Sequence, residues 1–228
     1  LTVLSMTLGT ALAITMAVMR QSINPVLRGV ASAYIWFFRG TPIYTQLIFW
    51  SLLPTLYRTI TLGIPGTEVG FSLETRAWFT PFWMAFIGLG LNEGAYLAEI
   101  IRAGILSVDQ GQWEAATALG MNRGKIFRRI ILPQAMRVIV PPIGNETISM
   151  LKTTSLVSAI PYTLELTFVA NQKGQELFQP VPLLIAAAIW YLIVTSILMR
   201  IQSRIEHHFG KGFDSTSPGD TTFIEVTP

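Results

Sequence analysis

The stretch QWEAATALGMNRGKIFRRIILP, residues 112–133, is polar and basic, and long apolar runs lie on both sides of it. Just before it, Asp109 is placed to cap a first short helix. Gly120 is suited to end that helix, because glycine adopts the left-handed conformation without a steric penalty. Asn122 predicts the start of a second, basic helix that ends near Pro133. The sequence therefore predicts two short helices joined at a sharp corner, with too little apolar surface to form a core and suited to dock a partner.

The composition indicates a membrane protein. Of the 228 residues, 51% are hydrophobic and 13% are charged, whereas an ordinary soluble domain carries roughly 25% charged residues. The net charge of +3 is small, and no basic patch interleaved with aromatic residues points to nucleic acid. The absence of cysteine from the sequence excludes disulfides, thiolate metal sites and a cysteine nucleophile. The two histidines, His207 and His208, are adjacent in the tail with no third ligand nearby, so we interpret them as solvated residues rather than a metal site.

Five apolar runs predict an all-α, polytopic membrane protein, since a helix needs roughly 20 residues to cross a bilayer. The predicted spans cover about 1–19, 30–54, 78–102, 134–160 and 181–199. The chain begins inside the first apolar run, without an initiator methionine or a charged leader. We therefore expect some of the natural N-terminus to be missing, and the sequence neither supports nor excludes a signal peptide.

Prolines and charges interrupt two of these spans. Arg39-Gly40-Thr41-Pro42 lies within the second, and the loss of a backbone donor at Pro42 predicts a bent or broken helix. Arg39 itself is interpreted as lying near a membrane face or on a protein-packed surface rather than in a pathway, because a charge in lipid is costly. Pro141 and Pro142 predict a second break, in the fourth span, and its polar residues favour a central position surrounded by protein.

The third span carries small and acidic residues. Gly90 and Gly94 have the GxxxG spacing that favours close helix packing. Glu93 and Glu99 exclude a lipid-exposed face, so this side must meet protein or water. Glu99 and Arg102, one turn apart, predict a structural ion pair.

The remaining segments are predicted to lie outside the membrane. Residues 57–76 and 161–180 are rich in turn-forming or polar residues and are expected to be loops, and residues 211–228 are expected to be a disordered tail. The basic residues of the 20–28 turn, of the 107–133 segment and of the region after Arg200 lie on one side if five spans are counted. The positive-inside rule places that side in the cytoplasm, with the N-terminus outside and the C-terminus inside.

A motif around Gly120 resembles that of a known family. The pattern is Glu114-Ala115-Ala116, then Gly120 after three residues, then Ile130-x-Leu132-Pro133 after nine more. It resembles the EAA loop of the membrane subunits of binding-protein-dependent, type I ABC importers. RGTP at 39–42, NEGAYLAE at 92–99 and LKTTSL at 151–156 resemble the polar amino acid branch of that family. Together these stretches cover nearly all of residues 1–210 except the insert after Tyr57.

This resemblance implies a function and partners. The chain would be the permease subunit of an ATP-driven amino acid importer in a bacterial cytoplasmic membrane, with residues 1–210 as its transmembrane domain. Its coupling loop, residues 107–133, would dock on a separate ABC ATPase subunit. An extracytoplasmic solute-binding protein would deliver the amino acid, and a second permease subunit, identical or homologous, would complete a dimer. The residues assigned to ATPase coupling are Glu114, Ala115, Ala116, Gly120, Ile130, Leu132 and Pro133.

The sequence predicts a transport subunit and not an enzyme. No histidine lies in the predicted membrane part to activate a serine. Gly120-x-x-x-Gly124-Lys125-Ile126 differs from a phosphate-binding loop, because only three residues separate the glycines and isoleucine replaces the serine or threonine that would hold magnesium. We therefore expect no cofactor on this chain, with ATP and Mg²⁺ used by the partner ATPase.

Polar residues of the third and fourth spans are the candidates to line a substrate pathway. They are Asn92, Glu93, Asn145, Glu146, Lys152 and Thr153. The carboxylates could meet an amino group or a basic side chain, and the amides and hydroxyl a carboxylate. The alternative is that these groups satisfy one another, for instance in a Glu146 and Lys152 pair, because buried polar groups need partners in any membrane protein.

A second function remains open at this point. The chain could be an ion- or proton-coupled secondary carrier of small polar solutes, in which Glu93 or Glu146 would titrate during transport. The coupling loop argues against it, because a gradient-driven carrier does not need a docking site for an ATPase.

Overall fold

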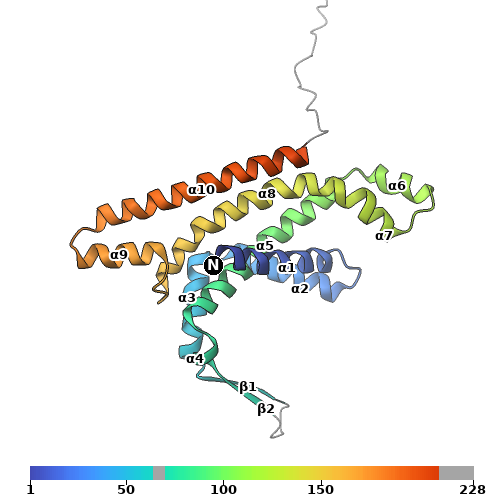
Figure 1. The fold of residues 1–228 in the computed structure, drawn as a ribbon. Coiled ribbons are helices and arrows are strands. Elements are labelled where there is room, and N and C mark those ends of the chain that lie inside the picture. Colours follow the sequence, from blue (N-terminus) through green and yellow to red (C-terminus); the bar gives the residue numbers. More distant parts are fainter. Residues whose placement is uncertain (64–69, 211–228) are drawn as a thin grey trace, which may run out of the picture.

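The computed structural model describes residues 1–63 and 70–210, which are mostly helical (Figure 1). The long helices are α1 (Thr2–Arg20), α2 (Pro25–Gly40), α3 (Ile43–Leu56), α5 (Pro81–Leu106), α8 (Leu132–Thr153) and α10 (Pro180–Gly210). The shorter elements are strands β1 (Thr59–Gly63) and β2 (Gly70–Glu74), helices α4 (Thr75–Trp78), α6 (Gln110–Ala118), α7 (Arg123–Ile126) and α9 (Leu166–Glu176), the π-helical η1 (Phe127–Ile131) and the 3₁₀ turn η2 (Thr154–Ala159).

Within the described residues, three helices are long and apolar enough to cross a membrane, namely Thr2–Arg20, Pro81–Leu106 and Pro180–Phe209. The segment predicted as the second span forms two shorter helices, α2 and α3, and α3 is apolar. The segment predicted as the fourth span corresponds to α8 followed by η2. The fold is therefore that of a helical, multi-pass protein, and the most polar of its long helices is α8.

Helix α5 packs closely against α1. A Cβ atom on Gly90 would lie 2.6 Å from Leu8 Cδ2, and one on Gly94 would lie 2.9 Å from Leu12 Cβ. In the other direction, a Cβ on Gly9 would come within 3.1 Å of the Glu93 side chain. The close packing predicted from the GxxxG spacing is confirmed, and α1 is the helix that uses it.

The predicted ion pair at the end of α5 is confirmed and is larger than expected. Arg102 donates to Glu99 Oε2 from Nη2 at 2.9 Å and from Nε at 3.2 Å. Arg20, the last residue of α1, pairs with the other oxygen of the same carboxylate. Glu99 therefore joins two helices that already pack through their small residues.

The predicted interruption at the RGTP stretch is also confirmed. Helix α2 ends at Gly40, Thr41 and Pro42 have extended backbone angles, and α3 begins at Ile43. Proline fixes its own φ and disfavours helical geometry in the residue before it, which explains why the break falls at Thr41. We refer to residues 40–42 as the α2–α3 break.

The predicted break at Pro141 and Pro142 is wrong. Helix α8 runs unbroken through both prolines. It lies between α5 and α10 (Figure 1), and Gln202 of α10 donates from Nε2 to the Pro141 carbonyl at 3.0 Å. Helix α8 is thus held between packed neighbours, an environment in which prolines are tolerated in membrane helices.

The proposed pairing of Glu146 with Lys152 is likewise wrong. No such pair occurs among the ion pairs of residues 1–63 and 70–210. On an unbroken helix, two residues six positions apart point about 120° away from each other and are separated by about 9 Å along the axis. The continuity of α8 therefore excludes the contact.

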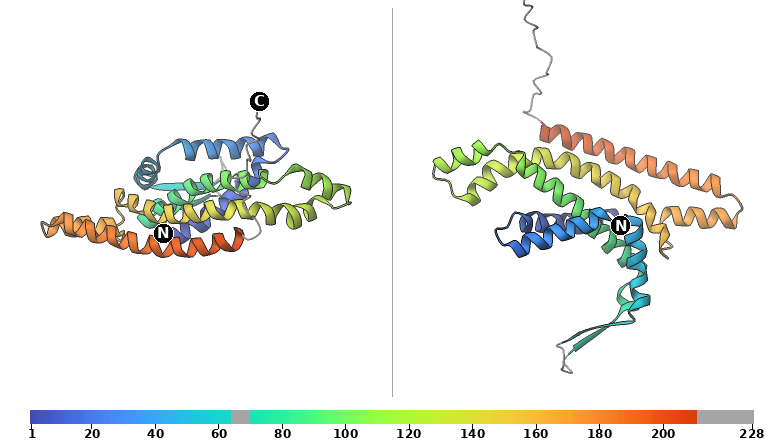
Figure 2. Two further views of the ribbon diagram at one scale, coloured as in Figure 1. Left: turned by 90° about the horizontal axis from the view of Figure 1, so that it is seen from above. Right: turned by 180° about the vertical axis from the view of Figure 1, so that it is seen from behind.

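Two segments expected to be loops contain regular structure. Within 57–76, β1 and β2 pair antiparallel, with Thr59 opposite Glu74 and Gly63 opposite Gly70; residues 64–69 lie outside the described part. The alternation of polar and apolar residues over Thr59–Leu62 is the strand signal that the glycines and proline of this segment obscured. The hairpin projects away from the helices in Figure 1 and in the right view of Figure 2.

Residues 161–180 contain α9, which the sequence interpretation missed. Glu165 caps it by accepting a hydrogen bond from the Phe168 N–H at 2.8 Å, and its other oxygen accepts one from the Tyr191 hydroxyl at 2.6 Å. Helix α9 then lies beside the first half of α10 (Figure 1). The predicted disordered tail, 211–228, lies outside the described residues.

Candidate transport pathway and coupling loop

The α2–α3 break, α5 and α8 enclose a cavity of about 580 Å³, which we call the pocket. Its polar lining consists of Arg39, Thr41, Asn92, Glu93, Tyr96, Glu146, Ser149 and Thr153. Three elements far apart in the sequence thus place two carboxylates, one guanidinium and several hydroxyl and amide groups around one space.

Four of the six predicted pathway residues line this pocket: Asn92, Glu93, Glu146 and Thr153. Glu146 and Thr153 share a face of α8 because they are seven positions apart, about two helical turns. Asn145 and Lys152 precede these two residues by one position each, so they point about 100° away. Both are exposed and neither belongs to the pocket lining.

Ser149 and Tyr96 line the pocket without having been singled out from the sequence. Ser149 lies three positions after Glu146 and four before Thr153, so helical spacing places all three on one face. This i, i+3, i+7 pattern is the signal that could have identified Ser149 as a neighbour of the pocket residues of α8.

Arg39 is exposed and lies in the pocket wall; its interpretation from the sequence, as a residue near a membrane face or on a protein-packed surface, stays a prediction. Its guanidinium carbon is 5.4 Å from the centroid of the Tyr96 ring. A guanidinium at this distance from a tyrosine ring is attracted by the ring's negative face. The α2–α3 break thus brings a positive charge, held by an aromatic ring, to the pocket.

Glu93 is the most enclosed ionisable group of the pocket. Only 5% of its surface is exposed, and its Oε1 has no hydrogen-bond partner within the described part of the chain. Gly9 of α1 packs against the base of this side chain. A buried carboxyl oxygen without a partner is costly, so a ligand that supplies a donor here would be favoured.

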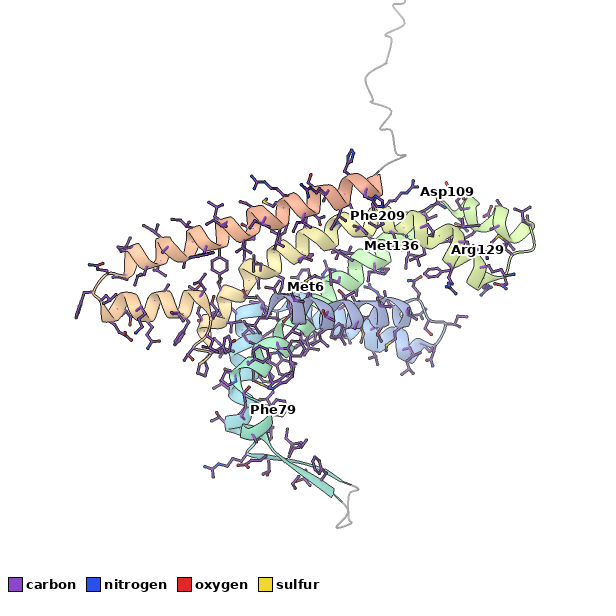
Figure 3. The ribbon with its side chains drawn as sticks, viewed as in Figure 1. Met6, Phe79, Asp109, Arg129, Met136 and Phe209 are labelled. Atoms are coloured by element: carbon purple, nitrogen blue, oxygen red, sulfur yellow. The ribbon has the colours of Figure 1, made fainter. Side chains whose placement is uncertain are left out.

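The coupling loop has the corner predicted for it. Asp109 caps α6 by accepting from the Gly111 N–H at 2.6 Å, and Asn122 caps α7 by accepting from the Lys125 N–H at 2.9 Å. Between them Gly120 has a φ of 73°, the left-handed conformation expected at the end of a helix. Asp109 and Arg129 are labelled at this end of the molecule in Figure 3, far from Phe79 at the base of the hairpin.

The second helix of the loop does not end near Pro133, contrary to the prediction. Helix α7 continues through η1 directly into α8. In η1 the Leu132 N–H donates to the Phe127 carbonyl, five residues earlier. This wider π-helical turn changes the hydrogen-bond register just before Pro133, which lies in the first turn of α8, where a missing N–H is tolerated. One helical path thus connects the coupling loop to the pocket residues of α8.

The coupling loop also has a small apolar core, which the sequence interpretation excluded. Ala116, Ile126 and Ile131 are buried together, and Trp113 and Met121 pack against them. The corner between α6 and α7 folds these side chains onto one another, a contact that separate helical patterns do not reveal. The loop is therefore a compact unit and not just a pair of exposed helices.

The residues assigned to ATPase coupling divide by exposure. Glu114, Ala115, Gly120 and Pro133 are exposed, Ile130 and Leu132 are half-buried, and Ala116 is buried. Leu119, which was not singled out, is 81% exposed at the corner. Of the seven assigned residues, the exposed four are free to contact a partner, and Ala116 instead holds the loop together.

Comparison with known proteins identifies the family. Residues 9–211 match the model of the binding-protein-dependent transport system inner membrane component. The chain belongs to this family. It is the permease subunit of an ATP-driven amino acid importer, and ATP is hydrolysed in a separate subunit. The alternative of a gradient-driven carrier is therefore not retained.

Several relatives are similar over most of the chain. The arginine transport system permease protein ArgU of Corynebacterium glutamicum is 56% identical over 216 residues, which cover 95% of this chain and 67% of the relative. The octopine permease OccM of Rhizobium radiobacter is 40% identical, over 90% and 80% of the two chains. The L-cystine permease TcyB of Bacillus subtilis is also 40% identical, over 92% and 82%.

Solved structures have the same fold. An amino acid ABC transporter crystallised with histidines aligns with a TM-score of 0.75 at 33% identity, over 91% of this chain and 88% of that one. The MetNI methionine transporter, in an inward-facing conformation, aligns with a TM-score of 0.64 at 17% identity and supports the fold alone.

Proposed function

We propose that the pocket carries a cationic amino acid, such as arginine, through the membrane. The observation that carries the proposal is the charge arrangement: Arg39 faces the same cavity as Glu93 and Glu146. A basic amino acid has one carboxylate and two cationic groups, which is the complement of one guanidinium and two carboxylates. A neutral amino acid would leave one of the two acidic groups without a charged partner.

Each group has a role in this arrangement. The Arg39 guanidinium can hold the α-carboxylate of the substrate through two parallel hydrogen bonds, a geometry that lysine does not reproduce. Glu93, almost fully buried, can accept from the α-amino group, and Glu146, half-buried, can accept from the basic side chain. Ser149 and Thr153 supply hydroxyl groups on the same face of α8.

The relatives support a basic substrate. The 56% identical permease is named for arginine, and the similar crystal structure is that of an amino acid transporter with histidines. Relatives at 40% identity are named for octopine and cystine. Substrate therefore varies within the family at that distance, so the charge of the pocket, and not family membership, carries the proposal.

The test compares arginine with citrulline, which has the same shape and a neutral side chain. We expect Glu146→Gln to weaken arginine binding to the purified permease–ATPase complex about tenfold, the effect of one charge-assisted hydrogen bond. Citrulline binding should change little. Calorimetry on the complex without the binding protein isolates the selectivity of the pocket.

Lys152→Gln is the matched control for that experiment, because it removes a charge from the same helix at a position outside the pocket. It should leave both affinities unchanged. Equal losses for arginine and citrulline in Glu146→Gln, or no loss for either, would contradict a cationic substrate held by this carboxylate.

We further propose five membrane spans, formed by α1, by α2 with α3, by α5, by α8 and by α10. The N-terminus lies outside, and the coupling loop and C-terminus lie in the cytoplasm, as the basic residues favour. In this orientation the exposed coupling residues dock on the ABC ATPase, which uses ATP and Mg²⁺, while this chain binds no cofactor. A solute-binding protein outside and a second permease subunit, identical or homologous, complete the importer.

A further inference from the structure

Gln46 is a buried glutamine one turn into α3, just after the α2–α3 break, and only 5% of its surface is exposed. Its Nε2 donates to Thr41 Oγ1 at 2.6 Å and lies 3.1 Å from both the Thr41 and the Phe38 carbonyl oxygens. All of these acceptors belong to the end of α2 or to the break itself. One side chain of α3 thus forms hydrogen bonds across the α2–α3 break to the end of α2.

The Phe38 carbonyl needs this contact because of Pro42. In an unbroken helix the carbonyl of residue 38 accepts from the N–H of residue 42, and proline has no N–H. Asn92 of α5 donates to the same carbonyl at 2.9 Å and also approaches Gln46 Oε1, at 3.3 Å. Two amides from different helices therefore replace the backbone bond that the proline removes.

We propose that Gln46 is a positioning residue for the substrate pathway: it fixes the pocket wall formed by residues 39–43, and with it Arg39. Gln46 does not itself belong to the pocket lining, whereas all five residues of the wall do. It therefore acts through the backbone and not through the substrate. The inference rests on the proposed function of the pocket, but the wall's geometry can be measured without knowing the substrate.

Loss of the Gln46 donors would release the wall. The Phe38 and Thr41 carbonyls would lose partners in a buried environment, and such groups regain hydrogen bonds by moving toward water or toward other donors. Asn92 alone reaches only the first of them. The break would then open, and Arg39 and Gly40 would leave their places around the pocket.

A single thiol at position 40 reports on the wall. The 228-residue sequence contains no cysteine, so Gly40→Cys introduces one thiol that a charged, water-soluble methanethiosulfonate reagent can modify. Gly29→Cys is the matched control on the same helix. Both glycines are exposed, and a Cβ at either position would meet no atom within 4 Å.

Each reporter is combined with Gln46→Met, which keeps the length of the side chain and removes its hydrogen bonds, or with Gln46→Glu, which keeps the shape and, when ionised, offers only acceptors. In the purified permease–ATPase complex we expect either change to alter the modification rate of the thiol at position 40 several-fold, because a charged reagent responds to the local potential of the charged groups around the pocket. The modification rate of the thiol at position 29 should not change. Should Gln46→Met fail to reach the membrane, the isosteric Gln46→Glu carries the test.

An unchanged modification rate in the Gly40→Cys reporter, or an equal change in the Gly29→Cys control, would overturn the positioning role. Arginine binding gives the second readout: the Gln46 variants should weaken it, with normal amounts of protein and of bound ATPase. If arginine proves not to be the substrate, only this second readout is lost. A failure of the proposed substrate is thereby distinguished from a failure of the positioning inference.

Discussion

The α2–α3 break and the corner of the coupling loop are both sharp interruptions between two helices, but different interactions stabilise them. Each ends one helix and starts another within a few residues. The corner is held by neighbours in the sequence, namely Gly120 in its left-handed conformation and Asn122 capping the next helix. The break is held by Gln46 and by Asn92, the second of which comes from another helix 54 positions away. The corner is thus held by neighbours in the sequence alone, whereas this pocket wall also depends on a helix from elsewhere in the bundle.

The two regions are joined by one helical path. It begins in the coupling loop, passes through η1 and continues as α8 to Glu146 and Thr153 in the pocket. The loop has its own buried cluster, so it can be displaced as a unit. A displacement of the loop therefore reaches the α8 side of the pocket directly, and the α2 side only through contacts between helices.

The largest expected effect is on the local corner. Gly120→Val forces a β-branched residue into the left-handed region, at a cost of about 1–2 kcal/mol. We expect it to lower the amount of ATPase that co-purifies roughly 5- to 30-fold, because the corner that presents the exposed coupling residues is distorted. The amount of ATPase retained on affinity-tagged permease from solubilised membranes measures this.

Two further variants separate backbone conformation from direct contact. Gly120→Asn should retain most of the ATPase, since asparagine tolerates the left-handed region and a Cβ here meets no atom within 4 Å. Gly124→Ala, whose Cβ would make only an ordinary 3.7 Å contact with Asn122 Oδ1, should behave as wild type. Equal losses for the valine and asparagine variants would show that the ATPase contacts Gly120 itself, and that conformation is not what matters.

A smaller effect is expected at the helix cap of the same corner. Asn122→Ala removes the acceptor for the Lys125 N–H, a change that costs about 1 kcal/mol at a helix N-terminus. ATPase affinity should fall about fivefold, as measured by titration of the purified subunits. Asn122→Ser keeps a capping oxygen and should restore it. If alanine and serine behave alike, the corner does not depend on its local cap, and the contrast with the α2–α3 break fails.

The same contrast explains what could be predicted from the sequence. Several predicted features depend only on spacings of a few residues, and the structure confirms them. They are the caps at Asp109 and Asn122, the turn at Gly120, the packing of Gly90 and Gly94 and the Glu99–Arg102 pair. The break at Pro42 was predicted, but Gln46 was not singled out. Its acceptors on Phe38 and Thr41 lie on the other side of the break, and it is the geometry of the break that brings them within reach.

The errors have a tertiary origin as well. Pro141 and Pro142 do not break α8, which packs between α5 and α10. Asn145 and Lys152 lie on a different face of α8 from Glu146 and Thr153 and do not line the pocket, and Arg39 lies beside Tyr96 in its wall; these placements depend on how the helices assemble. The hairpin was hidden by the glycines and proline of its connection.

The most direct test of the central claim is whether an amino acid occupies the pocket. Ser149 is exposed and lines it, so Ser149→Cys places a reactive thiol there. The rate at which a methanethiosulfonate reagent modifies this thiol in the purified complex would be measured with and without arginine, with Gly29→Cys as the control site. We predict that saturating arginine slows modification at position 149 several-fold and leaves modification at position 29 unaffected. Equal rates at position 149 with and without arginine, under conditions in which arginine is shown to bind, would place the substrate elsewhere and contradict a pocket that carries it.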